Sequence, residues 1–186
     1  MDASAVTRLI EEARARRPLV LVGIGGHGGA GKSTLAGALA GAQVVPTDAF
    51  WDGSWFDLER LRRDVVQPLL RGETARFAVY DWAARAPGGE RQVEPAGVVV
   101  IEGVCALHRT LRDAYDIRVW VEAPRELCLA RGLARDGEGA RSLWEERWRP
   151  SEERYVERDD PVPTAHVIVD GSGDSLVEGV RPLDRL

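Results

Sequence analysis

A glycine-rich loop with a single lysine constrains this chain more than any other feature. Residues 26–33 have the sequence Gly-His-Gly-Gly-Ala-Gly-Lys-Ser and match the pattern G-x-x-x-x-G-K-[ST] in full. The loop follows the apolar residues 19–24 and precedes the Ala- and Leu-rich residues 33–41. A strand before the loop and a helix after it are the context that this motif requires. The sequence therefore predicts a phosphate-binding loop.

Each part of the loop has a chemical task. Successive backbone N–H groups can curl around phosphate oxygens, and the N-terminus of the following helix favours negative charge. Lys32 is expected to reach the β- and γ-phosphates, and the Ser33 hydroxyl to bind Mg²⁺. The residues expected to bind the nucleotide are Gly26, Gly28, Gly29, Ala30, Gly31, Lys32, Ser33 and Thr34.

A second motif overlaps this loop. Gly23, Gly25 and Gly28 match the dinucleotide fingerprint G-x-G-x-x-G, and Asp48 lies 20 residues beyond Gly28. Two observations favour the phosphate loop instead. The glycines continue past Gly28 before any helix-forming residues begin. Lys32 is also the one lysine among 25 cationic residues, and the dinucleotide interpretation gives it no task.

Apolar strands alternate with helical segments along the chain. Strands are expected at residues 19–24, 44–45, 98–101, 117–121 and 167–169, and helices at 4–17, 33–41, 57–71, 124–135 and 143–158, with one more helix ending near residue 113. Strands that are apolar on both faces indicate a parallel sheet covered on both sides. The pattern predicts an α/β fold of the P-loop NTPase type, with a five-stranded parallel sheet and helices on both faces. The strand at 44–45 is expected beside the strand of the phosphate loop.

No linker divides the chain, so residues 1–186 are expected to form one domain with two insertions. A flap at about 50–95 would border the acceptor, and a lid at about 136–150 would cover the site. Within the flap, residues 72–96 are expected to be loop-like, with one extended patch at 77–82. Pro68 is expected to strain the helix at 57–71.

Composition excludes several classes of function. The net charge of −5 provides no basic footprint for nucleic acid. The apolar runs are too short to span a membrane, and the N-terminus lacks the features of a secretory signal, so a cytoplasmic location is expected. Cys105 and Cys128 form neither a disulfide framework nor a zinc motif. The sequence sets no oligomeric state.

Other motifs narrow the class of P-loop protein. The Asn-Lys-x-Asp motif with which GTPases recognise guanine is absent, because the chain contains no asparagine and no second lysine. Motor and helicase NTPases usually have an apolar strand that ends in Asp-Glu or Asp-Asp. Here the apolar residues 98–101 end in Glu102 and Gly103, a pattern that suits small-molecule kinases better.

Four segments, taken in order, resemble the uridine kinase family of nucleoside kinases. Residues 45–51 resemble that family's strand followed by Asp-x-Phe-Tyr, residues 77–82 its Pro-Val-Tyr-Asp-Phe segment, residues 101–104 its Leu-Glu-Gly-Ile, and residues 131–136 with Arg141 the arginines of its lid. Each segment is a weak signal alone, but their order and spacing are specific. The resemblance extends from about residue 20 to residue 169, which is most of the chain.

The resemblance implies a kinase that uses ATP and Mg²⁺ to phosphorylate a hydroxyl of a small molecule. It implies that Asp48 is the general base and also helps to hold Mg²⁺, with Glu102 supporting the metal. The lid arginines would neutralise charge on the transferred phosphoryl group. These arginines are Arg131, Arg135 and Arg141.

The acceptor pocket departs from the family pattern. The family's Asp-His-Pro-Asp segment corresponds here to residues 51–54, Trp-Asp-Gly-Ser, and its base-contacting histidine falls on Arg85. Trp51 and Tyr80 are candidates for stacking on a planar acceptor, or else pack the flap against the sheet. Arg85 would bind an anionic acceptor, or else is solvated. The acceptor stays open: a nucleoside, a vitamin-like, sugar or nicotinamide-riboside-like alcohol, or none, if the protein is a nucleotide-sensing regulator.

Overall fold

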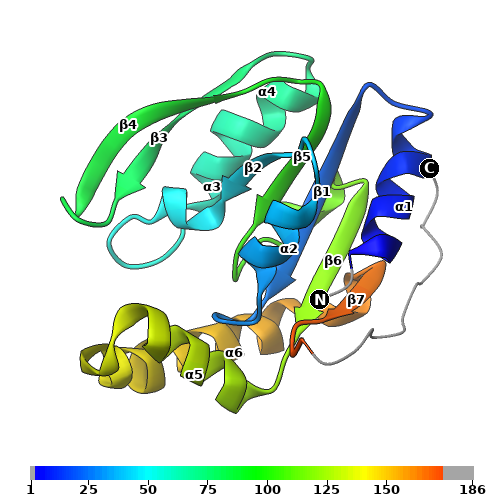
Figure 1. Cartoon of the computed structure of the whole chain (residues 1–186). Coiled ribbons are helices and arrows are strands. Elements are labelled where there is room, and N and C mark those ends of the chain that lie inside the picture. The colour runs from blue at the N-terminus through cyan, green and yellow to red at the C-terminus, as the bar shows by residue number, and fades with distance from the viewer. Residues whose placement is uncertain (1–2, 174–186) are drawn as a thin grey trace.

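A computed structural model, which describes residues 3–173, contains a central sheet of five parallel strands (Figure 1). The strands are β1 (Leu19–Gly26), β2 (Gln43–Pro46), β5 (Gly97–Glu102), β6 (Ile117–Glu122) and β7 (Val167–Asp170), in the order β2-β5-β1-β6-β7. The predicted five-stranded parallel sheet is confirmed. The expectation that β2 lies beside β1 is wrong, because β5 lies between them.

Alternate residues of β1 point to opposite faces of the sheet, and each face has its own apolar core. On one face, Val20, Val22 and Ile24 pack against α1 (Ser4–Arg14) and α2 (Lys32–Ala38). On α1 the packed residues recur with helical spacing, at Val6, Leu9, Ile10 and Ala13. This face is therefore covered by the two N-terminal helices.

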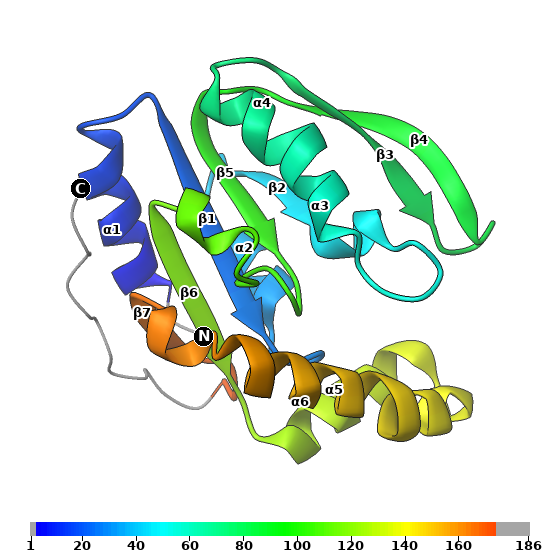
Figure 2. The same ribbon diagram turned by 180° about the vertical axis from the view of Figure 1, so that it is seen from behind.

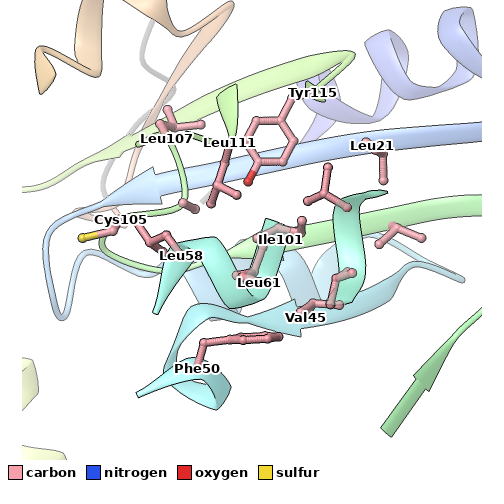
Figure 3. Close-up of a cluster of buried hydrophobic side chains, with 14 of the residues drawn as sticks. Leu21, Val45, Phe50, Leu58, Leu61, Ile101, Cys105, Leu107, Leu111 and Tyr115 are labelled. Atoms are coloured by element: carbon pink, nitrogen blue, oxygen red, sulfur yellow. The ribbon is translucent and has the colours of Figure 1, made fainter. Parts of the chain in front are cut away.

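The opposite face is covered by a helical segment that follows β2. This segment comprises a 3₁₀ turn, η1 (Thr47–Phe50), and then α3 (Leu58–Leu61), a π-helical turn, η2 (Arg62–Val66), and α4 (Gln67–Leu70). Pro68 has no N–H to donate, and the wider π turn before it leads the chain past this residue without breaking the helical segment. Figure 3 shows Leu58 and Leu61 of α3 packed near Val45 and Ile101 of the sheet.

Two expectations about segments between the strands are wrong. Residues 72–96 are not loop-like: they form an antiparallel hairpin of β3 (Ala75–Asp81) and β4 (Ala86–Val93) at the β2 side of the molecule (Figure 1). Nearly all of β4 is exposed, so its sequence lacks the alternation that predicts a strand. Residues 103–111 form turns instead of a helix, followed by η3 (Arg112–Ala114), because consecutive residues 105–107 are all buried over the sheet.

Packing explains the first two of the three glycines of the dinucleotide fingerprint. A Cβ added to Gly23 would lie 2.6 Å from the Tyr115 ring, and one added to Gly25 would lie 2.9 Å from Leu107. Figure 3 shows Tyr115, Leu107 and Leu111 close to the strand that contains Leu21. Gly23 and Gly25 therefore permit close packing of the turn segment on β1.

The remaining helices lie at the carboxyl ends of the strands (Figure 2). They are α5 (Arg125–Asp136), η4 (Glu138–Ala140), a π-helical turn η5 (Leu143–Trp148) and α6 (Arg149–Asp159), and η6 (Val162–Thr164) then leads into β7. Trp144 and Trp148, four residues apart, pack edge to face with ring centroids 5.1 Å apart. Within residues 3–173, no helix is both long enough and apolar enough to cross a membrane.

Candidate active site

A cavity of about 800 Å³ opens at the carboxyl edge of the sheet, where open α/β folds bind ligands. Its walls come from the phosphate loop, from the segment after β2, from the end of β5, from α5 and from η5 with α6. The volume lies in the upper part of the range for small-molecule sites, about 300–1,000 Å³. The cavity is therefore bordered by most of the segments that contain the candidate site residues predicted from the sequence.

The phosphate loop forms one wall of the cavity. Gly31 has φ of 104°, and Gly29 has φ of 79°, a left-handed conformation that favours glycine. A Cβ on Gly29 would also collide with the Cys128 carbonyl at 2.2 Å. Gly28, Gly29, Gly31, Ser33 and Thr34 line the cavity as expected, whereas Gly26 and Ala30 are buried behind the loop.

Lys32 lies at the start of α2 and is buried, with its Nζ 2.8 Å from the carbonyl oxygen of His27. Burial lowers the pKa of the Lys32 ammonium, and the nearby carboxylates, chiefly Glu102, oppose that shift. The bond to the His27 carbonyl keeps the amine within the loop. A cation is therefore held where the motif places the β- and γ-phosphates.

Ser33 and Glu102 form the oxygen-rich end of the site. The Ser33 hydroxyl donates to a Glu102 carboxylate oxygen at 3.0 Å, and Glu102 ends β5 directly beside β1. Burial raises the pKa of Glu102, against the opposing effects of Lys32 and Ser33. A cation bound here would offset that loss of hydration.

The oxygen atoms of Ser33 and Glu102 are of the kind that binds Mg²⁺. Hydroxyl and carboxylate oxygens are the donors that Mg²⁺ prefers, and this ion is usually held by one or two carboxylates together with substrate phosphates. Among residues 3–173, no cluster of three or more His, Cys, Asp or Glu side chains is arranged to hold a metal. The residues present fit an ion that is held jointly by Ser33, Glu102, Asp48 and the phosphates of a nucleotide.

Asp48 lies in η1, two residues past the end of β2, and lines the cavity. The cavity walls reduce hydration of Asp48 and raise its pKa, and the charges of Lys32 and Arg135 lower it only in part. The structure thus places a carboxylate close to both cations and accessible from the cavity.

The three predicted lid arginines differ in position. Arg131 and Arg135, one turn apart on α5, both line the cavity. Arg131 donates to the carbonyls of Gly171 and Ser172, at 2.6 and 3.1 Å, which ties α5 to the segment after β7. Arg141 lies outside the cavity lining and forms ion pairs with Glu138 and Glu145 on the surface.

The predicted acceptor residues also differ. Trp51 lines the cavity, but Tyr80 and Arg85 do not. Tyr80 packs edge to face behind Trp82, with ring centroids 5.0 Å apart. Arg85 is exposed at the turn between β3 and β4, where it has φ of 52°.

Several further residues line the cavity. Trp55, Phe56 and Trp82 belong to the flap aromatics that the sequence offers either for stacking on an acceptor or for packing the flap against the sheet, and all three line the cavity. Trp144 and Trp148, which no motif assigned to the site, also line it. Glu152, a buried carboxylate of α6 that contacts the phosphate loop, was likewise not predicted, because no local motif marks it within a helix rich in Glu and Arg.

The chain is similar to known proteins over most of its length. Residues 49–174, more than half of the chain, match the model of the Phosphoribulokinase / Uridine kinase family. The uridine kinase of Halobacterium salinarum is 27% identical over 171 residues, covering 75% of this chain and 76% of that protein. The uridine kinase of Escherichia coli K12 is 29% identical over 153 residues, covering 67% and 72%.

A solved structure shares the fold. The "Possible Uridine Kinase" from Bacillus stearothermophilus superposes with a TM-score of 0.62, covers 88% of this chain and 98% of its own, and is 18% identical. The range matched by the family model begins directly after Asp48 and includes β5 with Glu102 and α5 with Arg131. The chain therefore belongs to the phosphoribulokinase / uridine kinase family.

Proposed function

We propose that this protein is a kinase that transfers the γ-phosphoryl group of ATP to a hydroxyl of a small molecule. The observation that supports it best is the set of residues that line the cavity at the sheet edge. Lys32, Ser33, Asp48, Glu102 and Arg135 come from four different segments, and all of them line this cavity. Phosphoryl transfer needs such an arrangement, because its catalysis is mostly positioning and neutralisation of charge.

In the proposed reaction, the acceptor oxygen forms a bond to the γ-phosphorus as the bond from that phosphorus to the β–γ bridging oxygen breaks. The hydroxyl proton passes to Asp48, and ADP leaves. Lys32 and Arg135 stabilise charge on the phosphoryl oxygens. Mg²⁺, held by Ser33, Glu102 and Asp48 with the phosphates, would supply further neutralisation of that charge.

We further propose that uridine and cytidine are poor acceptors. Arg85, which stands where the family has its base-contacting histidine, is exposed at the tip of the hairpin. Asp52 accepts hydrogen bonds from the backbone N–H groups of Ser54 and Trp55, at 2.7 and 2.8 Å, so its carboxylate shapes the turn. Neither Asp52 nor Arg85 lines the cavity, which supports a different acceptor.

A nucleotide-sensing regulator is the alternative from another class. A sensor needs neither a base beside the phosphates nor space for a second ligand. The position of Asp48 and the flap aromatics that border the same cavity support the enzyme instead.

The proposal is tested by measuring ADP release from MgATP with and without hydroxylated acceptors. We expect release to depend on an acceptor, with a phosphorylated product detected by mass spectrometry. Nucleotide binding with no transfer to any acceptor would favour the regulator. The Lys32→Ala variant is the control for contaminating kinases.

A further inference from the structure

Four aromatic side chains of the flap form one continuous wall of the cavity. Trp51 and Trp82 lie with ring centroids 5.5 Å apart, Trp51 and Phe56 also 5.5 Å apart, and Trp55 and Phe56 5.0 Å apart. We call Trp51, Trp55, Phe56 and Trp82 the aromatic wall. All four line the cavity that contains Asp48. Five of the six tryptophans of the chain border this one cavity, and the sixth, Trp120, is buried in the sheet.

Two further tryptophans, Trp144 and Trp148, line the same cavity from η5. Trp55 also borders a groove shared with Ser151 and Arg154 of α6, so the start of α6 lies beside the wall. Trp148, one turn before Ser151, lines the main cavity. Figure 2 shows the loop between η1 and α3 across from the η5 end of this helix. A flat ligand entering here would meet aromatic faces from both sides.

The exposure of Trp82 is unusual for so large an apolar side chain. Half of the surface of Trp82 is accessible to solvent. Exposed apolar surface at the rim of a cavity indicates a binding site, because contact between apolar surface and water is unfavourable and a ligand would remove that contact. Aromatic rings stack well on other flat rings in offset or edge-to-face geometry.

The hydrogen-bonding groups near the wall do not suit a sugar. The carboxylates with printed partners in the cavity, Glu102, Asp136 and Glu152, accept bonds from Ser33, Trp144 and Gly28 and do not belong to the wall. Among residues 3–173, the indole N–H groups of Trp51, Trp55 and Trp82 have no protein acceptor. Indole groups only donate. A sugar lying against the wall would therefore find donors there but no acceptors for its hydroxyl hydrogens.

We propose that the acceptor is an aromatic alcohol: a flat ring of low polarity, without a polyhydroxylated sugar, whose side-chain hydroxyl reaches Asp48. This inference rests on the proposed kinase function and specifies its substrate class. The ring lies against the aromatic wall, and acceptor atoms on the ring take the free indole N–H groups. The hydroxyl proton and the phosphoryl group move as described above.

The test compares acceptors in one assay of ADP release and product mass, using the full chain with MgATP. The probes are 3-pyridinemethanol and quinoline-3-methanol, whose ring nitrogens accept hydrogen bonds, and the comparators are uridine, D-ribose and D-fructose. We expect kcat/KM for a probe to exceed that of every comparator at least tenfold. A comparator that is the best substrate overturns the inference and leaves the kinase function intact. Transfer to no compound, with MgATP bound normally, overturns both.

Two variants separate stacking from folding. Trp82→Ala should raise KM for the aromatic acceptor about tenfold, while KM for MgATP and the melting temperature change little, and Trp82→Phe should restore most of the affinity. The matched control is Leu70→Ala, since Leu70 is also an exposed apolar side chain but lies on α4, outside the cavity. Equal effects of Trp82→Ala and Leu70→Ala on acceptor KM would contradict the stacking role.

Discussion

The carboxylate of Glu152 accepts a hydrogen bond from the backbone N–H of Gly28, with its two oxygens 3.2 and 3.3 Å from that nitrogen. Glu152 lies on α6, and Gly28 lies 124 residues earlier, in the phosphate loop. The same carboxylate lies 3.3 Å from His27 Nδ1 and 3.4 Å from Arg125 of α5. One buried side chain thus connects both helices at the carboxyl edge to the loop that is expected to bind phosphate.

This contact predicts a loss of stability when the charge is removed. Glu152→Gln keeps the shape of the side chain but loses a buried, charged acceptor, so it should lower the free energy of unfolding by about 1–3 kcal/mol at pH 7. The neighbour Glu153 is exposed, and Glu153→Gln should change that energy by less than about 0.5 kcal/mol. Chemical denaturation of the three proteins measures both effects.

The loss of stability in the Glu152→Gln variant should depend on pH in a defined direction. Burial alone raises the pKa of Glu152, but His27, Lys32 and the Gly28 N–H together outweigh burial, so the folded-state pKa lies below the ordinary value of 4.5. The stability that the carboxylate contributes is therefore complete above that value and is lost as pH falls through the folded-state pKa. The difference in Tm between wild type and Glu152→Gln should shrink below about pH 4. A difference that stays constant down to pH 3 would contradict this.

Lys32 is the simplest test of the nucleotide site. Lys32→Ala removes the cation held at the phosphate loop, and we expect phosphoryl transfer to fall at least a hundredfold, by loss of charge stabilisation. The fold should persist, because Lys32 lines the cavity, so water can enter the space that the side chain leaves and hydrate the carboxylates beside it. Circular dichroism and thermal melting check the fold. Wild-type turnover by a normally folded variant would exclude the phosphate-loop interpretation.

The packing role of the fingerprint glycines is tested by stability. Gly25→Ala places a methyl group 2.9 Å from Leu107 and should destabilise the protein by about 1–3 kcal/mol. Gly37, on the exposed side of α2, has no atom within 4 Å of an added Cβ, so Gly37→Ala should instead stabilise by about 0.5–1 kcal/mol. Denaturant unfolding measures both. A stable Gly25→Ala variant would show that close packing does not require this glycine.

The regular parts of the fold could be predicted because each has a strong local signal. The parallel strands are continuous apolar runs, and α1 shows helical spacing of Val6, Leu9, Ile10 and Ala13. The β3–β4 hairpin could not be predicted, because its outer strand is mostly solvent-exposed and contains two glycines and a proline. The order of β2 and β5 is likewise a tertiary property, since either order satisfies the same apolar runs.

The candidate site likewise has one part that local sequence motifs predict and another part that depends on the tertiary structure. The phosphate loop and Glu102 follow from contiguous motifs, and the structure places them in one cavity. The acceptor residues depend on how the flap folds: Arg85 lies exposed on a turn, whereas Trp82, three residues earlier, lines the cavity. Neighbouring residues on a hairpin tip point in different directions, and sequence spacing alone does not decide which of them faces a ligand.

Asp48 provides the sharpest test of the proposed chemistry. Its carboxylate is accessible from the cavity, and its pKa responds to both Lys32 and Arg135, so it lies within range of the charges that surround a transferred phosphoryl group. Asp48→Asn keeps the shape of the side chain but cannot accept the proton of the acceptor hydroxyl. The value of kcat should fall by roughly a hundredfold or more, while KM for MgATP changes by less than about threefold.

The matched control for this variant is Asp52→Asn. Asp52 lies four residues further along the same segment, is exposed, does not line the cavity, and uses its carboxylate to hold the turn of residues 52–55. It should therefore leave kcat within about twofold of wild type, because no proton transfer passes through it. Steady-state kinetics with saturating acceptor measures both variants. If Asp48→Asn raised KM for MgATP and left kcat near wild type, Asp48 would act only in holding the metal–nucleotide complex, and another group would take the proton.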